Sequence, residues 1–121
     1  AGAFTTVPDL LLFGRRMLGG FLSPKVLRAV WSRAHQPVGC TRTLGWDTPS
    51  GDQSTLGPDF SPSSVGHLGF TGTSLWIDPA NGLTVALLTN RVHPTRDNPK
   101  ITDFRRGFHR ALAFDLGLHR G

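Results

Sequence analysis

The most informative segment of the chain is Gly66-His67-Leu68-Gly69-Phe70-Thr71-Gly72-Thr73-Ser74-Leu75-Trp76-Ile77-Asp78-Pro79. Three glycines stand at short intervals near its start, and an apolar run follows before the proline. Glycine weakens a strand interior and is usually retained where another backbone or a ligand approaches closely. We therefore interpret the segment as a strand whose open edge forms one wall of a binding cleft. The alternative is an edge strand softened by glycine, with a solvated His67.

Length and composition fit one domain of an ordinary globular protein, with 121 residues and 38% hydrophobic residues. The net charge of +5 comes mainly from arginines, since Lys25 and Lys100 are the only lysines. The arginines are scattered, which favours solvated helix faces over a nucleic-acid partner. The chain contains no run of about eighteen apolar residues, so no membrane-spanning segment is predicted. The first residues do not resemble a signal peptide, so the compartment stays open.

Residues 1–40 predict two helices. The first begins at Thr6-Val7-Pro8-Asp9, with a capping threonine, an early proline and an acid at the capping-box position, and Gly19-Gly20 ends it. The second begins at Ser23-Pro24 and is stopped by Pro37 and Gly39. Its expected apolar face comprises Val26, Leu27, Val30, Trp31 and Ala34.

Residues 41–64 predict a short strand, Thr43 to Thr48, and a loop over 49–64 of a length that is often functional or mobile. Residues 65–90 predict a β-hairpin of two strands, Val65–Asp78 and Leu83–Asn90. They are joined through Asn81-Gly82, a strong hairpin signal because both residues tolerate positive φ.

Residues 91–121 predict a polar bend, Arg91 to Pro99, and a final helix, Thr102 to Leu116. The expected apolar face of that helix is Phe104, Phe108, Ala111 and Leu112, with the basic residues Arg105, Arg106, His109 and Arg110 largely on other faces and His109 solvated. The whole is a single partial domain of the α+β class, with a small antiparallel sheet flanked by helices. So thin a domain suggests that part of its core is supplied by something else.

The chain lacks a self-contained catalytic motif. It has no Ser-x-x-Lys, Gly-x-Ser-x-Gly or His-Glu-x-x-His, and no tyrosine. A triad of Ser74, His67 and Asp78 is rejected, because Ser74 and His67 would lie about 23 Å apart along one strand. The five histidines show no metal-ligand spacing, and Cys40 is the only cysteine, so no metal or other cofactor is expected.

Four ordered segments resemble serine β-lactamase-related proteins, which include class C β-lactamases, penicillin-binding proteins, carboxypeptidases and esterases. The segments are Ala1-Gly2-Ala3-Phe4-Thr5-Thr6-Val7-Pro8-Asp9-Leu10, Leu44-Gly45-Trp46, the glycine-rich segment quoted first, and Leu87-Leu88-Thr89-Asn90-Arg91-Val92-His93-Pro94. The resemblance covers nearly the whole chain. It implies the C-terminal part of the β-lactamase/transpeptidase-like fold.

The resemblance also implies roles in the third motif of that family, which lines the acyl-transfer site. His67 takes the cationic or hydrogen-bonding position, Gly69 lets substrate lie against the strand, and the backbone N–H of Phe70 is one of two oxyanion-hole donors. Leu68 and Thr71 complete the implied substrate-binding set. Leu68 stands where the family usually has a hydroxyl, which puts β-lactam recognition in doubt.

The family's Ser-x-x-Lys and Tyr-x-Asn lie upstream of the matching segments and are absent from this chain. The chain therefore resembles the C-terminal portion of a serine hydrolase acting on an ester, amide or β-lactam: a fragment, one piece of a split chain, or a degenerate relative. It is expected to be silent alone and to pair with an N-terminal portion or with a second copy. The alternative is a binding or interaction module that kept the sheet and lost the chemistry.

Overall fold

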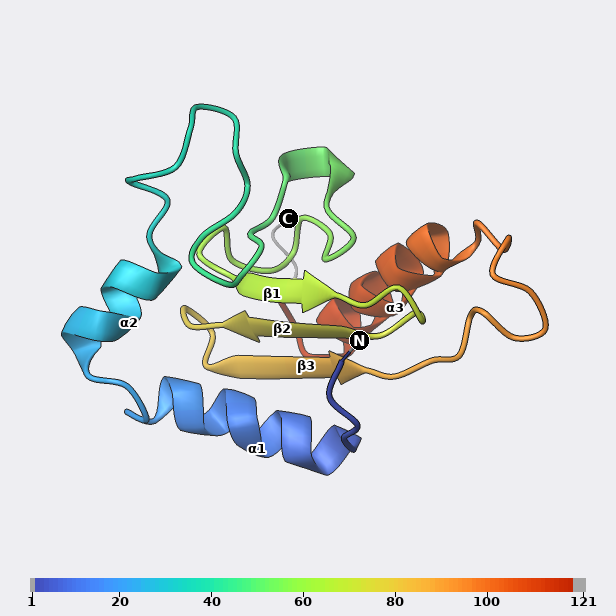
Figure 1. The fold of residues 1–121 in the computed structure, drawn as a ribbon, viewed down its shortest axis with the longest axis horizontal. Helices are drawn as coiled ribbons and strands as arrows, with labels where there is room; N and C mark the ends of the chain where they lie inside the picture. The colour runs from blue at the N-terminus through green and yellow to red at the C-terminus, as the bar shows by residue number, and fades with distance from the viewer. Residues whose placement is uncertain (1, 119–121) are drawn as a thin grey trace.

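The computed structural model describes residues 2–118, and a three-stranded antiparallel sheet lies at its centre. Strands β1 (Val65–Leu68), β2 (Ser74–Asp78) and β3 (Leu83–Leu87) are arranged in the order β1-β2-β3 (Figure 1). Strands adjacent in sequence are thus adjacent in the sheet, which short turns allow in antiparallel pairing. The predicted α+β class, a small antiparallel sheet flanked by helices, is confirmed.

The prediction of one long strand over Val65–Asp78 was wrong, because the chain reverses between Gly69 and Thr73. The Gly69 N–H donates to Thr73 O (2.8 Å), and the Gly72 N–H donates to Gly69 O (3.1 Å). Gly72 has a φ of 98°, which L side chains rarely adopt. The glycines therefore mark a turn, and the reversal pairs His67 directly with Leu75.

The second hairpin is confirmed, although its turn differs from the expected Asn-Gly type. Asp78 pairs with Leu83, so the loop has four residues, and only Gly82 in it has positive φ (65°). The Asp78 carboxylate accepts hydrogen bonds from the Ala80 and Asn81 N–H groups (3.1 and 3.2 Å). The loop is thus fixed by an aspartate side chain as well as by glycine. Strand β3 ends at Leu87, before the predicted end at Asn90.

Helix α1 (Val7–Leu18) has the predicted ends. Thr6 Oγ1 accepts from the Asp9 N–H (3.3 Å), and the Thr6 hydroxyl donates to the Asp9 carboxylate (2.9 Å). The helix packs on β3, where the Cβ direction of Gly14 is filled by the Thr84 side chain. A glycine is therefore required at this helix–sheet contact.

Helix α2 (Pro24–Trp31) begins at the predicted Ser23 cap but ends earlier than predicted. Ser32 is extended, and its hydroxyl accepts from the Ala34 N–H (3.0 Å). This local hydrogen bond competes with continued helix, so Ala34 lies outside it. On this side of the sheet a buried cluster is formed by Met17, Val65 and Ile77, with Leu18, Leu22, Leu27, Trp31 and Trp46 packed against it.

The strand predicted over Thr43–Thr48 is not formed. The Thr43 N–H donates to Trp46 O (2.9 Å) across a tight turn, and only isolated bridges occur, joining Arg42 to Asp47 and Asp47 to Gly66. Asp47 exchanges both backbone hydrogen bonds with Gly66 (2.7 and 2.9 Å), so the outer edge of β1 is covered at that residue.

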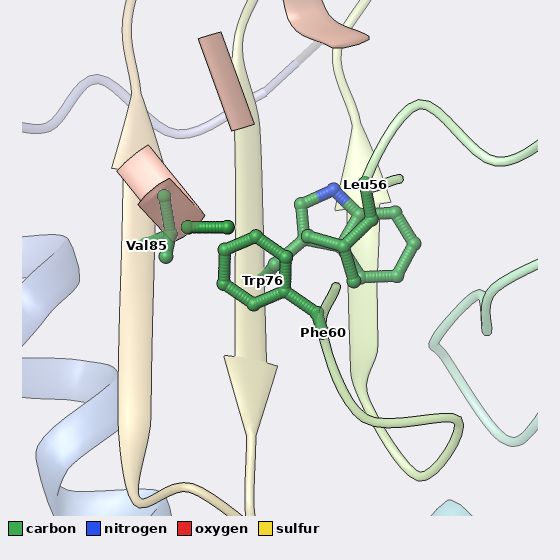
Figure 2. Packing of buried hydrophobic residues seen from close by; sticks show 5 residues of the cluster. Leu56, Phe60, Trp76 and Val85 are labelled. Atoms are coloured by element: carbon green, nitrogen blue, oxygen red, sulfur yellow. The ribbon is translucent and has the colours of Figure 1, made fainter. Parts of the chain in front are cut away.

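The segment 49–64 contains a 3₁₀ turn, Gly51–Gln53, and supplies the core on the other face of the sheet. A buried cluster is formed there by Leu56, Phe60, Trp76, Val85 and Ala113. Figure 2 shows the Phe60 ring and Leu56 lying close to the indole of Trp76 on the central strand. Because its side chains are core residues, this loop is structural rather than free to move.

Helix α3 (Ile101–Asp115) covers that face behind the sheet (Figure 1), but with a different side from the one predicted. Its buried residues are Arg105, His109 and Ala113, at positions i, i+4 and i+8. Phe104, expected inside, is 52% exposed, whereas His109, expected in solvent, is fully buried. The helix therefore presents two basic side chains to the interior.

Many large apolar side chains stay exposed in residues 2–118. They include Phe4, Leu11, Leu12, Phe13, Phe21, Val38, Leu44, Phe70, Phe104 and Phe114. None of the helices in the described residues has the length and apolar character needed to cross a membrane.

Candidate functional site

The turn between β1 and β2 is held through every one of its carbonyl groups. Arg105 Nη2 donates to Gly69 O (2.8 Å) and to Thr73 O (2.6 Å). Arg91 donates from Nε to Phe70 O (2.7 Å) and from its backbone N–H to Thr71 O (3.1 Å). The Thr89 hydroxyl donates to the Gly72 carbonyl (2.9 Å). The turn is thus fixed by residues that follow it in the chain.

Arg91 also lies over the ring of Phe70, with Cζ 4.5 Å from the ring centroid. This cation–π contact and the hydrogen bond to Phe70 O hold the residue at two points. The Phe70 side chain is nonetheless 64% exposed, so the residue stands at the surface of the molecule.

The Phe70 N–H donates to no acceptor within residues 2–118. It belongs to the same peptide unit as the Gly69 carbonyl, which faces Arg105. In a trans peptide the C=O and N–H point in opposite directions. The Phe70 N–H is therefore directed away from α3 and is available to an external acceptor.

His67 is exposed, and its ring is held at both nitrogens. Arg42 Nη1 lies 3.1 Å from Nε2, and Nδ1 lies 2.9 Å from Leu68 O. A guanidinium can only donate and a carbonyl can only accept. His67 is therefore assigned as the neutral tautomer with its proton on Nδ1, and the positive charge beside it belongs to Arg42. Asp47 lies near that charge, 3.8 Å from Arg42 Nε.

The Ser74–His67–Asp78 combination remains excluded, but for a different reason from the one given by the sequence. Because the strands are antiparallel, Ser74 pairs with Leu68 and His67 with Leu75, so the residues are close along the sheet. Paired residues share a face and successive residues alternate, so Ser74 and His67 point to opposite faces. Asp78 lies at the other end of β2.

A shallow hollow of about 250 Å³ adjoins β1 at the end of the sheet that carries this turn. It is lined by Ala3, Thr5, Leu10, His67, Leu68, Gly69, Thr73, Ser74, Leu75 and Leu88. Three of the predicted site residues, His67, Leu68 and Gly69, therefore meet at one hollow. A larger hollow of about 440 Å³ beside Trp31 lies away from them, among residues of α2 and the loops at the far end of the sheet.

The other predicted residues take distinct positions. Leu68 packs against the Trp76 core and also borders the hollow. Thr71 is exposed in the turn. The Cβ direction of Gly69 is filled by the Thr73 hydroxyl, and that of Gly66 by the Trp76 ring. Internal packing thus explains these two glycines without a ligand.

Arg105 is 5% exposed and forms no ion pair with any carboxylate of the described residues. Burial lowers its pKa, and the charge of Arg91 lowers it further. Two guanidinium groups therefore converge on the carbonyls of one turn, and those carbonyls compensate for the missing carboxylate.

Comparison with known proteins gives the family of the chain. The family model described as Beta-lactamase matches residues 1–109. The chain belongs to the beta-lactamase family. This beta-lactamase-family chain is 36% identical over 110 residues to a Salmonella enteritidis PT4 protein named "Putative D-alanyl-D-alanine carboxypeptidase". Proteins of that name from Salmonella paratyphi B and Salmonella newport match with the same identity.

Each of these matches covers 84% of this chain but 25% of the relative. The beta-lactamase-family chain thus spans about a quarter of the length of the curated relatives it matches. No solved structure matches it at a comparable level of significance.

Sequence reasoning missed three arginines of the site, Arg42, Arg91 and Arg105. Arg105 shares the i, i+4, i+8 spacing of His109 and Ala113, which was a visible signal. Basic residues on helices are usually solvated, so this spacing alone does not predict that an arginine is buried. Nothing in the local sequence pairs Arg42 with His67, which lies 25 positions later.

Proposed function

We propose that the chain is the C-terminal portion of a serine hydrolase that cleaves an ester or amide through an acyl-enzyme. In that reaction a serine oxygen attacks the carbonyl carbon, the alcohol or amine leaves, and water hydrolyses the acyl-enzyme. The serine is supplied by residues outside this sequence. Membership of the beta-lactamase family and the carboxypeptidase names of the relatives support the reaction class.

The observation that carries the proposal is the turn around Phe70. All its carbonyls are engaged, and the Phe70 N–H is left without an acceptor in the described residues. A fixed N–H at the surface can stabilise the negative charge that develops on a carbonyl oxygen during acyl transfer. His67, Leu68 and Gly69 would then contact the substrate along β1, and Thr71 would contact it from the turn.

The partner that we propose is an N-terminal portion carrying the nucleophile. Strand β3 is an edge of the sheet, and α1 beside it exposes Leu11, Leu12 and Phe13. An unpaired strand edge next to apolar side chains is suited to accept further strands and helices. A second copy of this chain could cover the same surface, and size-exclusion chromatography with light scattering would distinguish a dimer from a monomer.

The test is to express the reading frame that contains this sequence together with what lies upstream of it. We expect a Ser-x-x-Lys motif there and turnover of a p-nitrophenyl ester, nitrocefin or a D-alanyl-D-alanine peptide. The 121 residues alone should be catalytically inactive. Turnover by these residues alone, abolished by His67→Ala, would contradict the assignment of the nucleophile to another segment.

A non-catalytic binding module is the second candidate. Its support is Leu68, which packs into the core where related enzymes carry a hydroxyl. This alternative predicts that substrate analogues bind the longer protein without being turned over.

A further inference from the structure

We infer that Arg105 is a positioning residue for the Phe70 N–H, an inference that rests on the function proposed above for that group. Arg105 lies on α3 and does not touch the hollow beside β1. It acts through the peptide unit that joins Gly69 to Phe70.

The first step of the argument is geometric. One nitrogen, Arg105 Nη2, donates to both Gly69 O (2.8 Å) and Thr73 O (2.6 Å), the two carbonyls that close the turn. The same carbonyls accept from Gly72 N and Gly69 N (3.1 and 2.8 Å). A trans peptide is planar, so fixing the direction of Gly69 O fixes the opposite direction of the Phe70 N–H.

The second step is electrostatic. A cationic donor on a carbonyl polarises the whole peptide unit, and hydrogen bonds in a chain strengthen one another. The guanidinium on Gly69 O therefore makes the Phe70 N–H a stronger donor toward a developing oxyanion. Arg105 is 5% exposed, which keeps water from weakening this effect.

A purely structural role would be to attach α3 to the sheet. The neighbouring residue Arg106 provides the matched control, since its Nη2 donates to Gln53 O (3.1 Å), a backbone carbonyl remote from the turn. Both arginines join α3 to a loop, but only Arg105 contacts the peptide of Phe70. A purely structural role predicts that either variant, once folded, keeps the wild-type Phe70 amide resonance and kcat.

The test has two arms. In the ¹⁵N-labelled 121-residue chain, Arg105→Gln should move the Phe70 amide resonance upfield, whereas Arg106→Gln should leave it in place. In the longer protein, Arg105→Gln should lower kcat by about 10²-fold with KM nearly unchanged, since small misplacements of reacting groups cost this much. Arg106→Gln should keep the wild-type kcat.

An unmoved Phe70 resonance together with wild-type kcat in Arg105→Gln would overturn the inference, as would equal effects of the two variants. If Arg105→Gln does not fold, Arg105→Lys decides. The shorter lysine side chain should hold only one of the two carbonyls. This variant should therefore shift the Phe70 resonance and lower kcat by a smaller factor than Arg105→Gln. Wild-type values of both would overturn the inference. A longer protein without turnover refutes the proposed function, while the resonance still decides the role of Arg105.

Discussion

Arg42 and His67 are joined by a contact of 3.1 Å between Nη1 and Nε2, and this contact determines which form of the histidine stands at the candidate site. The ring cannot act as a cation while Nε2 accepts from Arg42. The charge next to β1 is therefore carried by a residue of the preceding loop.

Removal of Arg42 should release the His67 ring. In Arg42→Ala, Nε2 loses its donor while Leu68 O still accepts from Nδ1, so the preference for the Nδ1–H tautomer should weaken and some of the other tautomer should appear. Long-range ¹H–¹⁵N spectra of the imidazole report the tautomer directly. Arg33→Ala, which removes an exposed arginine away from His67, is the control. An unchanged pattern of ring nitrogen shifts in Arg42→Ala would show that the contact does not select the tautomer.

Phe70→Pro should remove the proposed oxyanion donor, the Phe70 N–H, while keeping the conformation of the turn. Phe70 follows Gly69 in a four-residue turn, and no residue other than glycine has positive φ among residues 2–118. This excludes the turn types that require positive φ at Phe70 or Thr71, and proline is favoured at the second position of a type I turn. We expect kcat of the longer protein to fall by about 10²–10³-fold.

The matched variant for that experiment is Phe70→Ala, which keeps the N–H but loses the ring beneath Arg91. It should retain most of the activity. Equal losses in the two variants would assign the effect to the ring rather than to the N–H.

The two interior helix glycines Gly14 and Gly107 should respond in opposite ways to alanine. At Gly14 a Cβ meets the Thr84 side chain, so Gly14→Ala should lower the free energy of unfolding by about 1–3 kcal/mol through overpacking. At Gly107 nothing lies within 4 Å of the Cβ position, so Gly107→Ala should raise it by about 0.5–1 kcal/mol.

Urea denaturation of the two variants checks the difference. Combining Gly14→Ala with Thr84→Ala should recover part of the loss, because the threonine side chain is the obstacle. Stabilisation by Gly14→Ala would mean that α1 does not pack on β3 as described.

Stability should fall with acidification because of His109. Burial lowers the pKa of this residue, and this outweighs the opposing effect of the hydrogen bond from its ring to Thr55 O (2.9 Å). The folded state thus stays neutral while the unfolded state, with a pKa of about 6.5, takes up a proton. The contribution of His109 is fully present above that value and is lost as the pH falls below it.

The free energy of unfolding, measured between about pH 7.5 and pH 5.5, should therefore decrease. In His109→Gln the decrease should be smaller, although the variant is less stable at every pH. His35→Gln, at an exposed position, should keep the wild-type slope. Parallel curves for the wild type and His109→Gln would refute the assignment.

The sequence alone predicted the features that depend on local chemistry. The caps at Thr6 and Ser23, the hairpin after Asp78 and the α+β class follow from side chains that act within a few residues of themselves. The candidate positions from His67 to Thr71 came from the family resemblance, which depends on residue identity along the chain.

The sequence could not predict which polar residues are buried by contacts with residues far away in the chain. Arg105 is buried because carbonyls of a turn 32–36 positions earlier take the place of a carboxylate partner. His109 is buried because Thr55 O and the rings of Phe60 and Phe108 surround it. For the same reason the glycines around His67 predict an open cleft wall, although Trp76 and Thr73 fill the space beside two of them.

The dependence of the turn on Arg91 and Arg105 has a consequence for chain synthesis. The ribosome releases His67 through Thr71 well before the donors that will hold their backbone. Until Arg91 and Arg105 emerge, the peptide of Phe70 lacks the two side chains that fix its direction. A product that stops at Asn90 would therefore contain every predicted site residue but leave the Phe70 N–H unfixed. In such a truncated product the motif would be present in the sequence, but the turn that it forms would lack the side chains that hold it.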